Sequence, residues 1–327
     1  MHIPDNYLSP ATCGTLVLAV APVWTVAVIK VKAQIKQKRE TLPMLGIAAS
    51  LAFLIMMFNL PIPGGTTAHA VGGALLAVLI GPWAAVLALT VTLLLQALLF
   101  GDGGILAFGA NAFNMAVIMP MVGYACYRLG EKLHHPKIGL FVGAYVGINV
   151  AALVAGIELG LQPLLAHTAS GAPLYCPYGL TVTVPAMLAA HLLVAGWVEA
   201  IFTVLVYQFI QKVAPTNLYQ AAAPQSRRPW LYLLGGLVIL SPLGLLASNT
   251  AWGEWSATEL KARLAQQHLG QQVPQGMAQG LHFKALFQDY TIGHLPISLG
   301  YILSAITAIL IFLLLMRGLQ HDSQTTK

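Results

Sequence analysis

Long apolar runs separated by short polar loops dominate the chain. At least six of these runs approach or exceed the roughly 20 apolar residues that a helix needs to cross a bilayer. The pattern therefore predicts an all-α integral membrane protein, with a seven-helix body and two additional C-terminal transmembrane helices. We expect the nine spans at residues 12–31, 43–60, 67–81, 82–100, 105–130, 138–157, 181–211, 231–248 and 295–316.

The third and fourth predicted spans form one apolar stretch, which we divide at Gly81-Pro82 because this pair is a turn signal. The basic residues then set the orientation. With the N-terminus outside and the C-terminus inside, the inner loops hold all Lys and Arg residues except Lys261, Arg263 and Lys284. This asymmetry is what the positive-inside rule predicts for nine spans.

Composition agrees with this class of protein. Of the 327 residues, 57% are hydrophobic and 8% are charged, against roughly 25% charged residues in a typical soluble domain. The formal net charge of +6 comes from residues scattered over short loops, without a basic stripe beside aromatic residues. We therefore expect a lipid bilayer, and no nucleic acid, as the chain's surroundings.

Three prolines and an Ala/Gln/Ser-rich stretch mark residues 213–229 as a cytoplasmic linker. It separates a membrane domain, residues 1–212, from a two-helix accessory region, residues 230–327. That region carries an outer segment at 249–294. Within it, the spacing of Ser256 and Glu259 predicts a capped helix.

Motifs for catalysis are missing. The sequence has no G-x-x-x-x-G-K-[ST] loop to cradle ATP and no H-E-x-x-H metalloprotease motif, so we expect a protein that is not an enzyme and needs no resident cofactor. The cysteines Cys13, Cys126 and Cys176 are too few for a disulfide framework. We expect buried thiols, although a bridge between Cys13 and Cys176 stays open.

Two histidines could form an unusual metal site. The amine of Met1, the amide nitrogen of His2 and the ring Nδ1 of His2 can chelate one ion in fused five- and six-membered rings. An imidazole from His69 would complete four nitrogens in a plane, which suits Ni(II) or Cu(II) and fits Zn(II) poorly. The use of position 2 requires that the N-terminus is retained, and the start lacks the basic region of a signal peptide. The residues alone leave open a solvated His2 and a helix-end His69.

Three stretches resemble a known family. They are MHIPDNYLSP at residues 1–10, GTTAHAVGG at 65–73 and LLFGDGG at 98–104, the last continuing to GANAFNMA at 109–116. They are similar to the substrate-binding components of energy-coupling-factor (ECF) cobalt and nickel transporters, of the CbiM and NikM type. The resemblance covers roughly residues 1–212, and His191 with Glu199 fits it too. One departure is Asn6, where glycine is more usual.

The resemblance implies a function and partners. In that family the metal is held by the first residue's amine, the second residue's amide and ring, and a loop histidine, which here correspond to Met1, His2 and His69. The transported ligand would be Ni(II) or Co(II). The partners would be a membrane coupling (T) subunit and two cytoplasmic ATPase subunits. The chain itself would lie in the plasma membrane. The C-terminal region resembles a fused accessory (N-type) subunit, from which we assign no ligand.

Further candidates have assembly or structural roles. Glu199 is a carboxylate inside a predicted span, which is costly unless it is paired. We consider both a pair with His191 or another subunit and an internal hydrogen bond. The pair Ala48 and Ala52, like Gly143 and Gly147, permits close helix contact, either with another subunit or within the bundle.

The main alternative function is a stand-alone secondary transporter of divalent metal ions. That mechanism predicts ionisable groups near the middle of the membrane and broken helices, and His191 and Glu199 are the only strong candidates for such groups. A membrane metalloenzyme would need an open coordination position, which a filled nitrogen plane does not offer. A structural scaffold would tolerate replacement of His2 and His69.

Overall fold

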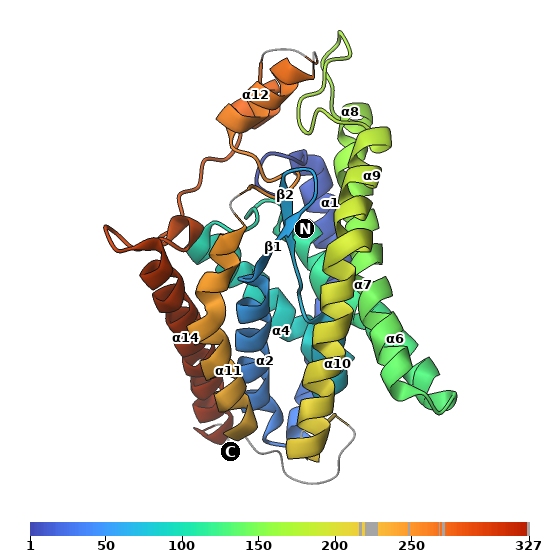
Figure 1. The fold of residues 1–327 in the computed structure, drawn as a ribbon, viewed down its shortest axis with the longest axis vertical. Helices are drawn as coiled ribbons and strands as arrows, with labels where there is room; N and C mark the ends of the chain where they lie inside the picture. Colours follow the sequence, from blue (N-terminus) through green and yellow to red (C-terminus); the bar gives the residue numbers. More distant parts are fainter. Residues whose placement is uncertain (216–217, 220–227, 248, 268, 270–271, 326–327) are drawn as a thin grey trace.

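Helices build almost the whole protein (Figure 1). The computed structural model describes residues 1–215, 218–219, 228–247, 249–267, 269 and 272–325. Six of the described helical segments are long and apolar enough to cross a bilayer. These segments are Pro10–Gln37, Pro82–Phe100, Pro136–Leu165, Leu180–Val213, Arg228–Leu246 and Ile297–Leu319. The chain is therefore a multi-pass membrane protein.

Most predicted spans correspond to described helices. The elements that match them are α1 (Pro10–Gln37), α2 (Thr41–Met56), α4 (Pro82–Leu95) with the π-helical turn η1 (Gln96–Phe100), α5 (Phe108–Asn111) with η2 (Ala112–Ile118) and α6 (Met119–Lys132), α7 (Pro136–Gly160), α9 (Leu180–Ala190) with η3 (His191–Ala195) and α10 (Gly196–Val213), α11 (Arg228–Leu240) with η5 (Ser241–Leu246), and α14 (Ile297–Thr325). A short helix α8 (Gln162–Leu165) follows α7.

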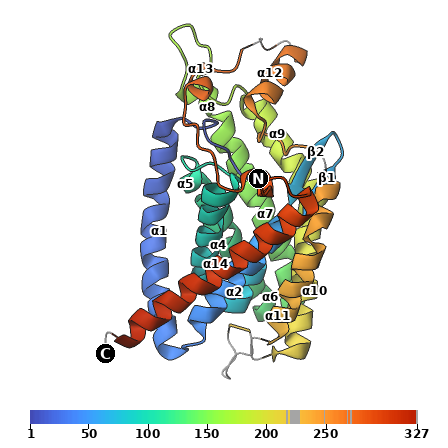
Figure 2. The same cartoon turned by 90° about the vertical axis from the view of Figure 1, so that its left-hand side faces the viewer.

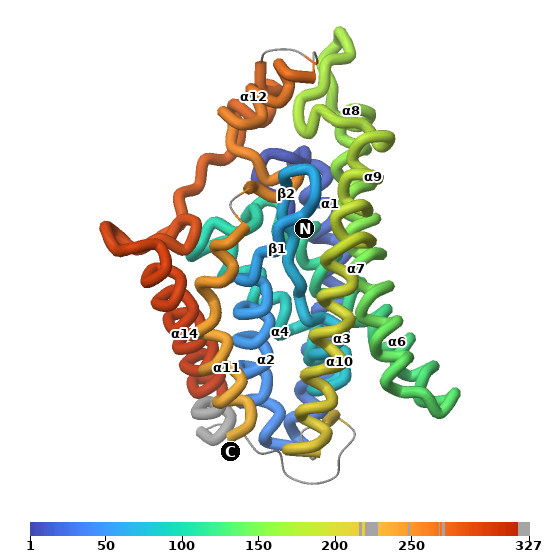
Figure 3. The backbone as a smooth tube through the Cα atoms, viewed as in Figure 1, coloured from blue at the N-terminus to red at the C-terminus, as the bar shows by residue number. Residues whose placement is uncertain are grey.

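The predicted helix at residues 67–81 is wrong. Residues Asn59–Ile62 (β1) and Thr66–His69 (β2) pair as an antiparallel hairpin in which Asn59 lies opposite His69. Only Gly73–Ile80 (α3) is helical, and eight residues span about 12 Å, too little to cross a bilayer alone. Gly72 explains the late start of α3, because its φ of 82° is a left-handed conformation that glycine adopts without a steric penalty. Figure 3 shows this extended stretch leading into α3 inside the bundle.

Helix α2 lies at the centre of the bundle. All but one of its residues are buried, and its main neighbours are α14 and α4. Ala48 lines a small internal gap with Leu79 of α3 and Trp230 of α11, and Ala52 is fully buried. The proposed docking of another subunit on Ala48 and Ala52 is therefore not supported, because the chain's own helices cover this face.

Glycines bring α6 and α7 into close contact. A Cβ atom on Gly143 would lie 2.5 Å from the carbonyl oxygen of Gly123, and one on Gly147 would lie 2.9 Å from that of Met119. The pair Gly143 and Gly147 thus packs within the bundle. The cysteines are buried or half-buried and free, so the bridge between Cys13 and Cys176 is absent.

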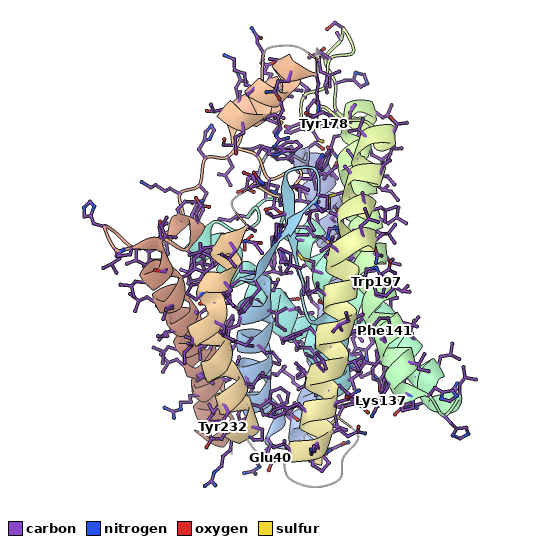
Figure 4. All side chains as sticks on the ribbon, in the orientation of Figure 1. Glu40, Lys137, Phe141, Tyr178, Trp197 and Tyr232 are labelled. Atoms are coloured by element: carbon purple, nitrogen blue, oxygen red, sulfur yellow. The ribbon has the colours of Figure 1, made fainter. Side chains whose placement is uncertain are left out.

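The accessory region packs beside the body and folds back over the end that carries the β1–β2 hairpin. Helices α11 and α14 lie against α2, and α14 crosses the bundle obliquely (Figure 2). The segment between them contains α12 (Ala257–Gln266), α13 (Gln275–Ala278) and the single turn η6 (Gln288–Tyr290). The predicted cap is confirmed, since Ser256 and Glu259 form a complete capping box. Figure 4 places Tyr178 at this end of the molecule and Glu40 and Lys137 at the opposite end.

The close contact between α6 and α7 gives a stability prediction. Gly143→Ala places a methyl group against the backbone of Gly123, so the two helices must separate. We expect a loss of about 1–3 kcal/mol, measured as the midpoint of thermal unfolding in detergent. Gly235→Ala is the matched control, because nothing lies within 4 Å of a Cβ there. An equal response of both variants would contradict the close packing.

Candidate functional site

Met1 is buried at the end of the bundle that carries the β1–β2 hairpin. Met1 is 3% exposed, His2 is 4% exposed and Ile3 is completely covered. A solvated terminal histidine would be freely accessible, so that alternative is wrong for His2. The first three residues instead form part of the interior.

Asn111 holds this terminus in place. Its Oδ1 accepts a hydrogen bond from the amide of Ile3 at 2.7 Å, and its Nδ2 donates to the Ile3 carbonyl at 2.9 Å. The amide of Gly104 donates to the same carbonyl at 2.9 Å. Leu106 then donates its amide to Asp5 Oδ1 at 2.7 Å. The bonds to Ile3 satisfy buried main-chain groups that would otherwise oppose burial.

The departure at Asn6 has a structural explanation. Asn6 has a φ of 69°, a left-handed conformation that asparagine tolerates better than most residues. Its side-chain amide donates to the Leu281 carbonyl at 2.8 Å and accepts from the Leu281 amide at 2.9 Å. Asn6 therefore makes the turn and also ties the N-terminal segment to the accessory region, which glycine could not do.

His2 and His69 face each other. Nδ1 of His2 lies 3.2 Å from Nε2 of His69, and the ring centroids are 5.0 Å apart. Nδ1 of His69 donates to the Ala70 carbonyl at 3.0 Å, so in the neutral ring Nε2 carries a lone pair. For metal–nitrogen bonds of about 2.0 Å, neighbouring nitrogens of a square plane lie about 2.8 Å apart. The two histidines are therefore close to the spacing of adjacent ligands.

Burial keeps His69 neutral. His69 lies on β2, outside the membrane-crossing helices, and is 5% exposed. Loss of hydration, followed by the positive charge of the nearby amino terminus, lowers its pKa well below the usual value. A neutral imidazole is the form that binds metal ions.

Carboxylates contact both ends of the Met1–His2 unit. The Met1 amine lies 3.4 Å from Glu254 Oε1 of the accessory region, and His2 Nδ1 lies 3.1 Å from Asp102 Oδ1. Tyr290, also from the accessory region, donates its hydroxyl to the other oxygen of Asp102. None of these three residues, nor Asn111, is assigned a role from the sequence. Asp102 and Asn111 lie in stretches that carry the family resemblance, which was the available signal, whereas Glu254 and Tyr290 lie in the C-terminal region that resembles the accessory subunit.

Glu199 supports the loop that follows His69. Its carboxylate is fully buried and accepts hydrogen bonds from the amides of Val71 at 2.7 Å and Gly72 at 3.0 Å. It is not paired with His191. Of the two interpretations considered for this carboxylate, the internal hydrogen bond is the one that the structure contains. Glu199 therefore fixes the backbone two and three residues beyond His69.

His191 begins the π-helical turn η3, which packs against β2. Its Nδ1 donates to the Met187 carbonyl at 2.7 Å, and its buried Nε2 has no hydrogen-bond partner among the described residues. Because this turn packs against the strand that carries His69, His191 lies near the site. A second buried carboxylate, Glu158, accepts from Asn114 at 2.7 Å and was missed because it lies just beyond the predicted end of its span.

Side chains alone do not make a conventional metal cluster in this protein. Within the described ranges, no group of three or more His, Cys, Asp and Glu side chains is arranged to hold a metal ion. The arrangement of His2 and His69 is compatible with this absence, because a chelate there would take its remaining nitrogens from the Met1 amine and the His2 amide.

Comparison with known proteins defines the family. The sequence model of CbiM, the cobalt uptake substrate-specific transmembrane region, matches residues 2–217. The chain belongs to the CbiM family. The resemblance carried by the N-terminal and loop motifs is thereby confirmed, and the model of the PDGLE domain matches residues 227–321.

Several relatives of this CbiM-family chain have the same two-part organisation. A probable fused nickel transport protein LarMN from Lactiplantibacillus plantarum is 79% identical over 327 residues and covers both chains completely. The fused nickel transport protein NikMN of Rhodobacter capsulatus is 45% identical, with 94% of each chain covered. A crystal structure of a truncated transition metal transporter is 57% identical with a TM-score of 0.62, covering 65% of this chain and 99% of that one.

The support of the His69 loop by Glu199 can be tested by amide hydrogen exchange. Glu199→Gln replaces one acceptor oxygen by a donor that faces the amides of Val71 and Gly72. Hydrogen bonds to charged groups contribute about 1.5–3 kcal/mol, so exchange in peptides covering residues 66–73 should accelerate by at least about tenfold. Glu158→Gln, which removes another buried carboxylate without touching this loop, should leave these peptides unchanged. Equal protection in the parent and Glu199→Gln would contradict the role.

Proposed function

We propose that this CbiM-family chain is the metal-capturing membrane subunit of an ECF-type importer of Ni(II) or Co(II). The observation that carries the proposal is the buried N-terminus, whose His2 Nδ1 lies 3.2 Å from His69 Nε2. The names of the relatives from Lactiplantibacillus plantarum and Rhodobacter capsulatus, which describe nickel transport, support the choice of substrate.

The proposed chelate uses four nitrogens. The Met1 amine, the His2 amide and His2 Nδ1 form two fused rings around the ion, and His69 Nε2 supplies the fourth position. The ion would lie between the two imidazoles, where their ring nitrogens now face each other. Planar nitrogen ligation favours Ni(II) and accommodates Co(II), whereas Zn(II) prefers a tetrahedron.

Transport would depend on partner subunits. The chain has no nucleotide-binding loop, so a membrane coupling (T) subunit and two cytoplasmic ATPase subunits would supply the energy. The Lys and Arg distribution predicts that Met1 faces the outside of the plasma membrane and that the C-terminus lies inside. The ion would then enter at the end that carries β1, β2 and α12.

The alternative of a secondary transporter of divalent metal ions is less well supported. Such a transporter needs ionisable groups that can exchange protons or sodium within the membrane. Glu199 instead accepts hydrogen bonds from two main-chain amides, and His191 donates to a helix carbonyl. Among the residues whose burial is described, Glu158 is the other buried carboxylate on which this alternative would depend.

Insertion of one alanine between Met1 and His2 tests the chelate. The insertion keeps every side chain but moves the histidine to position 3 and breaks the fused rings. The insertion also creates a longer chelate of the amine, two amides and the moved ring, so uptake in cells is its deciding measurement. His69→Ala creates no new chelate, and for this variant we expect nickel and cobalt affinity, measured by titration of the purified full chain, to fall by at least about a hundredfold. His167→Ala is the control, because that exposed ring bonds only to the Thr168 carbonyl.

Uptake in cells must be measured beside the titration, because a longer N-terminal chelate with two amides can still bind nickel. Loss of uptake in both variants, together with loss of binding in His69→Ala, supports the proposal. Parent-like binding and uptake in both variants would show that Met1 and His2 are not ligands, and would favour the secondary transporter.

Metal binding at this site should release protons. Nickel must displace the proton of the His2 amide and competes with protons for the Met1 amine, whereas burial keeps the His69 ring neutral. Affinity should therefore fall as the pH is lowered, and at least one proton should be released per ion. Calorimetric titration in buffers of different ionisation enthalpy counts these protons. If no proton is released when the ion binds, ligation by the amine and the amide is contradicted.

A further inference from the structure

A groove of about 360 Å³ lies where the two accessory helices meet the body. Its lining comes from Pro43 and Ile47 of α2, from Leu231 of α11 and from residues between Leu310 and Arg317 of α14. Both accessory helices pack on α2. The groove therefore follows the joint between the body and the accessory region.

The course of α14 over α2 explains why a groove forms here. A Cβ atom on Gly46 would lie 2.9 Å from Cγ of Met316 and 3.2 Å from the Phe312 carbonyl oxygen, so the two helices touch at this glycine. From there α14 runs obliquely away from α11 (Figure 2). Two helices that diverge over a third leave a space between them, and the groove occupies this space.

The groove faces the hydrocarbon part of a bilayer. Its α11 and α14 residues belong to the membrane-crossing segments Arg228–Leu246 and Ile297–Leu319. Leu231, Leu310 and Leu314 are each more than half exposed, and no carboxylate belongs to the described lining. In a membrane, lipid tails rather than water cover such side chains.

The lining favours a lipid tail over a helix of another subunit. Helices associate in a bilayer mainly where small residues let their backbones approach, as α14 approaches α2 at Gly46. The described lining of the groove contains no glycine, alanine, serine or threonine. An acyl chain is thin and flexible and follows the uneven surface between branched side chains, so it fits this groove better than a helix does.

Arg317 supplies a positive charge to the groove. It is exposed and is the one charged residue in the described lining, and the ion pairs found among the described residues do not include it. It stands two residues before the end of its membrane-crossing segment. Its stem can therefore lie on apolar surface while the guanidinium reaches the headgroups, where it suits a phosphate because it can donate two parallel hydrogen bonds.

Other charges at this end of the molecule also favour an anion. In Figure 1 the first turns of α2 and α11 and the last turns of α14 lie at the same end. Arg228 is the first residue of α11 and Arg39 lies in the turn before α2, and both are exposed. Glu40 in that turn is half-buried and opposes them with one negative charge. The three arginines thus leave a positive balance.

We propose that this groove binds an anionic phospholipid, with an acyl chain against Ile47, Leu231 and Leu314 and the phosphate paired with Arg317. The lipid fills the space between α11 and α14 and so stabilises the accessory region on the body. The proposal is independent of the metal and of the four-nitrogen chelate. It concerns the joint that keeps the accessory region, with its contacts to Met1 and Asp102, in place.

Native mass spectrometry of the purified full chain tests the phosphate contact, with phosphatidylglycerol and phosphatidylcholine of equal chain length as probes. Arg317→Gln should weaken phosphatidylglycerol binding by about fivefold and leave phosphatidylcholine binding unchanged. Lys137→Gln is the matched control, because it removes an exposed positive charge at the same end (Figure 4) but outside the groove. An equal loss in both variants, or equal binding of the two lipids by the parent, would overturn the proposal.

A variant that fills the groove tests the position of the acyl chain. Leu231→Trp adds bulk to the wall without changing any charge, and it should weaken phosphatidylglycerol binding by at least about tenfold. Leu205→Trp on α10 is its control, because Leu205 is also exposed but does not line the groove. Unchanged phosphatidylglycerol binding in Leu231→Trp, together with weaker recovery of a membrane partner subunit, would overturn the lipid in favour of a docked helix.

Thermal unfolding separates lipid binding from a folding defect. Because Arg317 is exposed, Arg317→Gln should unfold at the parent's midpoint when no lipid is added. Phosphatidylglycerol in excess should raise the parent's midpoint by about 3 °C or more and that of Arg317→Gln by clearly less. The same rise in both proteins would contradict stabilisation through this groove.

Discussion

The paired hydrogen bonds between Asn111 and the main chain of Ile3 are the interaction on which the site depends. A chain terminus carries a charge and unpaired amides, so its burial is unfavourable unless partners replace water. Asn111 provides both a donor and an acceptor for one residue, and Gly104 adds a third bond. With Ile3 fixed in this way, Met1 and His2 have no freedom to return to the solvent.

The site is assembled from parts of the chain that are far apart in sequence. The N-terminal segment supplies His2, the β1–β2 hairpin supplies His69, and the buried carboxylate of Glu199 holds the loop behind that histidine. The accessory region adds Glu254 beside the Met1 amine and Tyr290 behind Asp102. The accessory region is therefore in contact with the proposed ligands, which makes it part of the site's architecture.

The amino-acid sequence predicts the membrane helices well where an apolar run coincides with a turn signal, as at Gly81-Pro82. It failed at residues 67–81, because a short apolar run fits a buried strand and a short helix equally well. The candidate ligand roles of His2 and His69 could be predicted from chelate chemistry and from the family resemblance. The contacts of Asp102 with His2 and Tyr290 were not, since no local periodicity reports which residues meet across the fold.

X-ray absorption at the nickel edge of the loaded, purified full chain tests the central claim most directly. The account predicts low-coordinate planar nickel with nitrogen ligands, two of which show the multiple scattering of imidazole. Replacing His69 by alanine should reduce the imidazole contribution from two rings to one. A six-coordinate spectrum dominated by oxygen, or one unaffected by the loss of His69, would contradict capture of the ion by the buried N-terminus.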